Sequence, residues 1–146
     1  MNTLLRRGDA WLFPLAPPER LATLRILTGL FAVIYLAVRL RAFLVLADAQ
    51  PSRFEPVGVL SFLGSPLPGP LVVGLVFVAL GFGLAYTLGV WFRVCGPVFA
   101  LVLLVLSTYR SSWGQILWIE NLMVLHVLIV GFAPSADALT LMAFST

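Results

Sequence analysis

The sequence predicts an all-α integral membrane protein, built as a bundle of four transmembrane helices. Hydrophobic residues make up 61% of the 146 residues and charged residues only 10%, whereas soluble domains average about 25% charged residues. Apolar runs of membrane length recur along the chain, and turn-forming or arginine-bearing segments separate them. Each span needs roughly 20 apolar residues to cross a hydrocarbon core of about 30 Å. A single membrane domain over residues 1–146 therefore has room for about four spans.

The order of the elements follows from these runs. We expect residues 1–17 to form an interfacial segment, because Arg6 and Arg7 stand near Trp11 and such groups favour the headgroup zone. Residues 50–70 contain five prolines and three glycines, which predict a Pro/Gly-rich loop along the membrane surface or a short re-entrant turn. The predicted helices are residues 18–48, 71–92, 94–109 and 115–133, with a tight connection at Arg93.

Composition also excludes several classes of function. The nine arginines are scattered along the chain, singly except for the pair Arg6 and Arg7, and there is no lysine, whereas nucleic-acid footprints are clustered basic stripes. Cys95 is the only cysteine and His126 the only histidine, so an internal disulfide, a cysteine-based metal site and a haem held by two histidines are not possible within the chain. We expect no metal site and no nucleic-acid partner.

The last apolar run, residues 116–133, contains the strongest candidates for function. It carries Glu120, Asn121 and His126 at membrane depth, where polar groups are costly and normally face a bundle interior, a cavity or a ligand. Hairpin connectivity places this part of the chain on the same side as several arginines. Glu120 is predicted to pair with one of them, either as a structural ion pair or as a catalytic group. The candidate partners are Arg39, Arg41, Arg53 and Arg110, and the candidates for ligand binding or ion pairing are Arg53, Arg110, Gln115 and Asn121.

His126 lies six residues after Glu120, about 240° around a helix. The two side chains therefore point to different faces, and a direct dyad is not expected. Three roles stay open for His126: a hydrogen bond to a backbone carbonyl, binding of a quinone oxygen, and relay of a proton.

Two further predictions concern packing. Gly81, Ala85 and Gly89 recur every fourth residue and form what we call the small-residue face, which would let another helix approach closely. Arg25 lies a turn or two inside the first helix. We expect its side chain to snorkel to the headgroups.

The stretches PLAPPERLATLRILTGLFAVIYLAVRL, SRFEPVGVLSFLGSPLP and YRSSWGQILWIENLMVLHVLIVGFAPSADALTL resemble the N-terminal part of the bacterial HTTM (horizontally transferred transmembrane) family. That family is related to the membrane domain of the vitamin K-dependent gamma-carboxylase. The resemblance implies a protein of the bacterial inner (cytoplasmic) membrane. Family members are longer, so we expect a shortened relative, a truncated product or one subunit of something larger.

The departures from the family limit the activity that the resemblance implies. The carboxylase relatives are thought to use a lysine base, and this chain has no lysine, so we expect no carboxylase activity. Trp118 stands where a histidine often precedes the acidic residue of the ENL motif, and a site that needs that histidine would be impaired. A four-span unit is also similar in architecture to the DoxX-like partners of redox enzymes.

Two hypotheses for function result. The first is a non-catalytic accessory or structural subunit without a cofactor, packed against other membrane chains in the lipid bilayer. The second is a quinone-linked or redox-associated membrane enzyme, in which Glu120 and His126 handle protons and Arg53 or Arg110 holds an anionic or carbonyl group.

Overall fold

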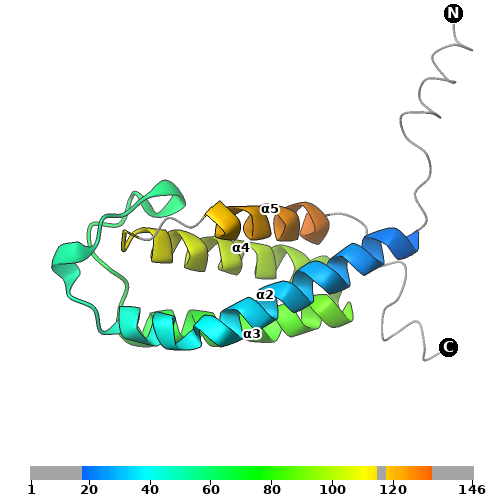
Figure 1. The fold of residues 1–146 in the computed structure, drawn as a ribbon, viewed down its shortest axis with the longest axis horizontal. Coiled ribbons are helices and arrows are strands. Elements are labelled where there is room, and N and C mark those ends of the chain that lie inside the picture. Colours follow the sequence, from blue (N-terminus) through cyan, green and yellow to red (C-terminus); the bar gives the residue numbers. More distant parts are fainter. Residues whose placement is uncertain (1–17, 115–117, 133–146) are drawn as a thin grey trace, which may run out of the picture.

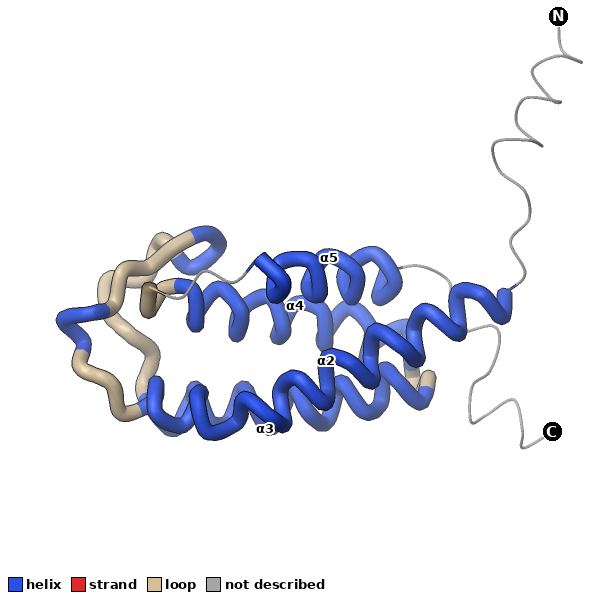
Figure 2. Tube along the Cα trace, in the orientation of Figure 1, coloured by secondary structure: helices blue, strands red, loops and turns tan. Residues whose placement is uncertain are grey.

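The computed structural model describes residues 18–114 and 118–132, and over these residues the chain is helical, with no strand. The four long helices are α2 (Pro18–Ala47), α3 (Gly69–Leu88), α4 (Phe92–Ser111) and α5 (Trp118–Phe132). Figure 1 shows them running along one long axis, with the segment between α2 and α3 gathered at one end. Figure 2 shows that helix dominates and that loops are confined to the connections.

Three of these helices, α2, α3 and α4, are long and apolar enough to cross a membrane. The described part of α5 is shorter, with 15 residues. The predicted helix 18–48 agrees with α2 to within one residue, since α2 ends at Ala47 and Asp48 lies in a turn, and the predicted helix 115–133 agrees with α5 over residues 118–132. The predicted interfacial segment, residues 1–17, lies outside the described residues, as do residues 115–117 and 133.

The connection between α3 and α4 differs from the prediction. Gly89 has a φ of 74°, and the Val90 N–H donates to the carbonyl of Ala85 at 2.9 Å, a geometry that ends a helix. The turn therefore lies at residues 89–91 and not at Arg93, which is already inside α4. Helix α4 begins two residues earlier and ends two residues later than predicted, so Pro97 lies within it.

The Pro/Gly-rich segment folds back onto the end of α4. It contains two short 3-10 helices, η1 (Pro51–Arg53) and η2 (Gly58–Leu60). The backbone N–H of Glu55 donates to the Ser112 carbonyl at 2.9 Å, and that of Val57 donates to Ser112 Oγ at 3.2 Å. These bonds fix the loop as a cap over one end of the bundle.

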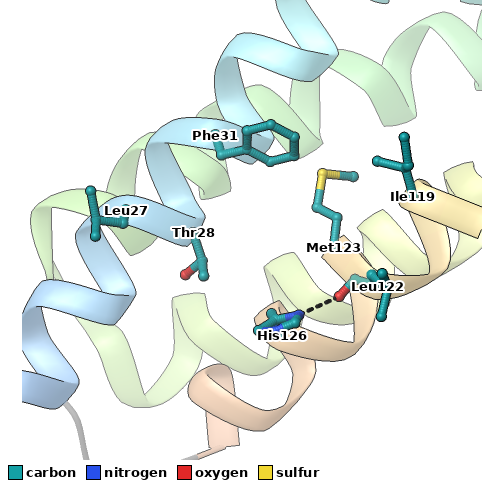
Figure 3. Close-up of a pocket in the computed structure, with 7 residues that line it drawn as sticks. All are labelled: Leu27, Thr28, Phe31, Ile119, Leu122, Met123 and His126. Carbon is teal, nitrogen blue, oxygen red and sulfur yellow. Dashed lines mark hydrogen bonds between the residues drawn. The ribbon is translucent and has the colours of Figure 1, made fainter.

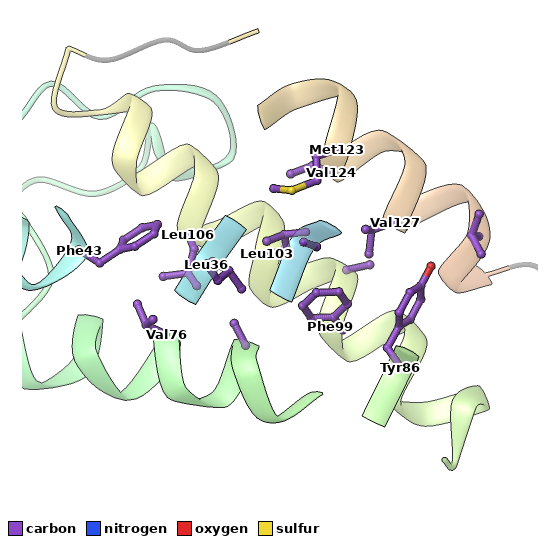
Figure 4. Close-up of a cluster of buried hydrophobic side chains, with 14 of the residues drawn as sticks. Leu36, Phe43, Val76, Tyr86, Phe99, Leu103, Leu106, Met123, Val124 and Val127 are labelled. Atoms are coloured by element: carbon purple, nitrogen blue, oxygen red, sulfur yellow. The ribbon is translucent and has the colours of Figure 1, made fainter. Parts of the chain in front are cut away.

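A continuous apolar core runs between the four helices (Figure 4). Helix α3 packs on both α2 and α4, and α4 packs on α5. The contact between α2 and α5 is the least extensive of the four helix pairs that pack together. Of the three membrane-length helices, α4 is the most buried, and a groove is left between α2 and α5. The large side chains of this core include Leu36, Phe43, Tyr86, Phe92, Phe99, Leu103 and Leu106.

Candidate functional site

Three polar side chains from three helices meet inside one end of the bundle. Arg110, in the last turn of α4, forms a salt bridge with Glu120, in the first turn of α5. The hydroxyl of Tyr35, from α2, donates to Glu120 Oε1, and Arg110 Nη1 donates to that hydroxyl oxygen at 2.5 Å. We call this group the Tyr35–Arg110–Glu120 cluster. It joins α2, α4 and α5 through one carboxylate oxygen.

The ion pair of this cluster is buried. Arg110 and Glu120 are each 2% exposed. Burying two charges carries a large desolvation cost, which only close pairing and further hydrogen bonds offset. Of the four arginines predicted as partners for Glu120, Arg110 is the one that pairs with it. The arrangement is suited to holding helices together, and Glu120 is not presented to an open surface.

Other arginines surround this cluster. The Arg39 guanidinium lies over the Tyr35 ring, 5.4 Å from its centroid. Arg41 and Arg110 line a cavity of about 290 Å³ whose remaining wall is aliphatic, formed by Ala42, Val45 and Leu46. The predicted candidate Arg53 does not join this group: it lines a neighbouring hollow with Val45, Asp48, Ala49 and Gln50.

His126 lies elsewhere, on the open side of α5. Its Nδ1 is 2.7 Å from the Leu122 carbonyl oxygen. Figure 3 shows this residue at a groove of about 300 Å³, where side chains of α2 face side chains of α5. Glu120 is buried and His126 is exposed, as the predicted separation around the helix requires. The rest of the groove is lined by Leu27, Thr28, Phe31, Ile119, Leu122 and Met123.

The hydrogen bond of His126 defines which proton its ring carries. A carbonyl oxygen can only accept, so Nδ1 must be the protonated donor. In the neutral ring Nε2 then has a free lone pair and accepts hydrogen bonds. Thr28, across the groove, already donates its hydroxyl proton to the Leu24 carbonyl at 2.7 Å. In this state His126 Nε2 offers one acceptor to the groove, whereas the Thr28 hydroxyl oxygen lies 3.3 Å from the Tyr86 hydroxyl, which can donate to it.

Of the two remaining candidates, the structure describes only Asn121. Asn121 is exposed on the outer face of α5. Gln115 lies outside the described residues. Among residues 18–114 and 118–132, no three His, Cys, Asp or Glu side chains gather closely enough to hold a metal ion.

The small-residue face does not mark the closest approach between helices of this chain. Gly81 is exposed, and a Cβ added there would meet no atom within 4 Å. The closest backbone approach involving a helical glycine is instead between α4 and α5, where a Cβ on Gly96 would lie 2.6 Å from the Gly131 carbonyl oxygen. The correct signal was present in the sequence, because Gly96 and Ala100 have the same four-residue spacing of small residues.

The prediction that Arg25 snorkels to the headgroups is wrong, since its side chain is fully buried at 0% exposure. Its guanidinium lies over the Phe92 ring, 5.5 Å from the centroid. A Cβ on Gly89 would lie 2.9 Å from Arg25 Nη2. Arg25 shares its helix face with the buried small residues Ala22 and Gly29, and that periodicity could have revealed its inward direction.

Comparison with known proteins found no protein similar to this chain. No family model, no curated protein and no solved structure matches this chain. The resemblance to the HTTM family therefore stays a prediction.

Proposed function

We propose that this chain is a small polytopic protein of the bacterial cytoplasmic membrane that acts as a non-catalytic accessory or structural subunit of a membrane complex. Three helices with the length and composition of membrane spans support the membrane placement. The resemblance to the HTTM family supports the assignment to the bacterial cytoplasmic membrane.

The observation that carries the non-catalytic role is the use of Glu120. Among the described residues it is the buried acidic side chain, since Glu19 at the start of α2 is exposed, and a buried carboxylate in an apolar helix is the natural candidate for acid–base chemistry. Its Oε1 is occupied by both Arg110 and Tyr35, and the residue is 2% exposed. A carboxylate held in this way stabilises the packing of three helices and has little access to a substrate.

The outer face of α2 supports a role in assembly. Only 17% of its membrane-length segment is buried in this chain, compared with 50% for α4. Large side chains such as Ile34 and Val38 point outward, and Val38 is 76% exposed. Contiguous apolar surface of this kind faces lipid or another membrane helix. We therefore place the partner chain against α2.

This proposal is tested by gentle extraction of the full chain from its membrane, followed by mass spectrometry of the molecules that co-purify with it. We expect a larger membrane protein in fixed stoichiometry. Replacing Ile34 and Val38 on α2 by alanine should release it. The matched control replaces Phe77 and Leu84, which are exposed on α3, and should retain it. The accessory role would be contradicted if the chain purified without a partner protein, or if both variants lost the partner equally.

A second candidate function is favoured by the groove at His126. An apolar groove with one hydrogen-bond acceptor suits a hydroxyl-bearing ring, so the quinone-linked enzyme would bind the reduced, quinol form in the neutral state of His126. Under this alternative, His126→Ala should abolish quinol binding, and with it turnover, without loss of assembly, while Asn121→Ala should leave both unchanged. If His126→Ala changes only yield or stability, the enzyme hypothesis fails.

A further inference from the structure

The cavity beside Arg41 and Arg110 combines charge with an aliphatic wall. Arg110 is buried and Arg41 is exposed, so one guanidinium forms the floor and the other the rim. The wall between them is made of Ala42, Val45 and Leu46. Val45 is 70% exposed, which leaves apolar surface beside the charges.

Among the described side chains named around this cavity, the positive charges outnumber the negative ones. Arg39 interacts electrostatically with Arg110, and these two like charges repel each other. Glu120 supplies one negative charge to a group that contains Arg39, Arg41 and Arg110. Asp48 does not correct the imbalance, because it faces the neighbouring hollow together with Arg53. An added anion at this position would be attracted by the excess positive charge, most strongly where the medium is least polar.

The depth of the cavity identifies the kind of anion. Helix α2 has 30 residues and is about 45 Å long, close to the thickness of a bilayer with its headgroups. Arg41 is six residues from Ala47, where the helix ends, or about 9 Å along the axis. This places the guanidinium near the boundary between headgroups and hydrocarbon. The aliphatic wall continues along the same helix toward the hydrocarbon.

We propose that the cavity between Arg41 and Arg110 binds the headgroup of an anionic phospholipid, whose acyl chain lies along Ala42 and Val45. The planar guanidinium group matches phosphate oxygens in a fork geometry, and basic pockets between membrane helices are suited to lipid phosphates. The inference rests on the membrane placement in the proposed function, but not on the accessory role.

The test uses the purified full chain in a neutral detergent, titrated with phosphatidylglycerol, phosphatidylcholine or inorganic phosphate and read by native mass spectrometry. We expect phosphatidylglycerol to bind in preference to phosphatidylcholine. Arg41→Gln should weaken that binding about fivefold, since one arginine near an anionic membrane surface contributes about that factor. Arg93→Gln is the matched control, because Arg93 is also exposed but lies at the other end of α4. It should leave binding unchanged.

Three results would overturn the inference. Equal binding of phosphatidylglycerol and phosphatidylcholine would mean that the cavity does not distinguish an anionic headgroup from a zwitterionic one. Inorganic phosphate that binds as tightly as the lipid would identify a site for a free anion. Equal losses in the Arg41 and Arg93 variants would reduce the effect to overall charge. None of these results bears on the accessory role, whereas extraction without any detergent would contradict the membrane placement itself.

Discussion

Among the described residues two arginines are buried, Arg25 and Arg110, one toward each end of the helix bundle, and the contacts described for them differ. Arg110 pairs with a carboxylate, and Tyr35 joins the pair. The contacts described for Arg25 are an aromatic ring, that of Phe92, and the close backbone of Gly89. A buried guanidinium can thus pack on the face of an aromatic ring as well as beside a carboxylate, and packing on a ring is much harder to see in a sequence.

The same contrast extends to the way each end is packed. At the Arg110 end, a polar cluster joins the helices, and the loop bonded to Ser112 covers them. At the Arg25 end, α4 and α5 approach so closely that Gly96 and Gly131 leave no space for a side chain. One end is therefore sensitive to charge and the other to volume.

The largest expected effect is at the charged end. Glu120→Ala leaves Arg110 buried without its partner and should lower the free energy of unfolding in mixed micelles by about 3 to 5 kcal/mol. Asn121→Ala, an exposed neighbour on the same helix, is the control and should change it by less than about 0.5 kcal/mol. An equally small change for Glu120→Ala would show that the cluster does not hold the bundle together.

The second effect tests the end that is sensitive to volume. Gly96→Ala places a methyl group against the Gly131 carbonyl and should destabilise the protein by about 1 to 3 kcal/mol, the usual cost of overpacking. Gly81→Ala adds the same methyl group at a position with open space around it. A loss of stability in the Gly81 variant, with none in the Gly96 variant, would restore the predicted small-residue face as the packing site.

The sequence was sufficient to predict the helices and the charged end. Apolar runs and prolines located α2 to α5 within a few residues, because length and hydropathy alone define such helices. Glu120 was recognisable because a carboxylate in an apolar run requires a partner. Which arginine pairs with Glu120 depends on the rotation of α4 relative to α5, and that rotation is determined by tertiary packing.

The other end could not be predicted as well. An arginine near a helix end is usually accounted for by snorkelling, and sequence spacing alone does not say that Phe92 lies where it can cover Arg25. Gly89 was assigned to packing, although its position at the end of an apolar run is typical of a helix stop. The groove at His126 arises from the limited contact between α2 and α5, which no local pattern encodes.

A third prediction concerns Gly89, where backbone conformation and the packing of Arg25 coincide. Gly89→Ala must adopt a positive φ and also push against the Arg25 guanidinium. We expect a loss of about 1 to 2 kcal/mol in the free energy of unfolding, from the left-handed conformation alone. Gly89→Asn is the informative companion, because asparagine tolerates this conformation but still meets Arg25. If Asn restores full stability, the contact with Arg25 has no energetic role.

The smallest effect separates the tyrosine from the ion pair. Tyr35→Phe keeps the ring below Arg39 but removes the hydroxyl that donates to Glu120. We expect a loss of about 0.5 to 1.5 kcal/mol, the usual net value of one hydrogen bond. Combined with Glu120→Gln in a double-mutant cycle, the two losses should add up to more than the loss in the double variant, because both changes weaken one network. Strict additivity would show that Tyr35 contributes only its ring, and the charged end would then depend on Arg110 and Glu120 alone.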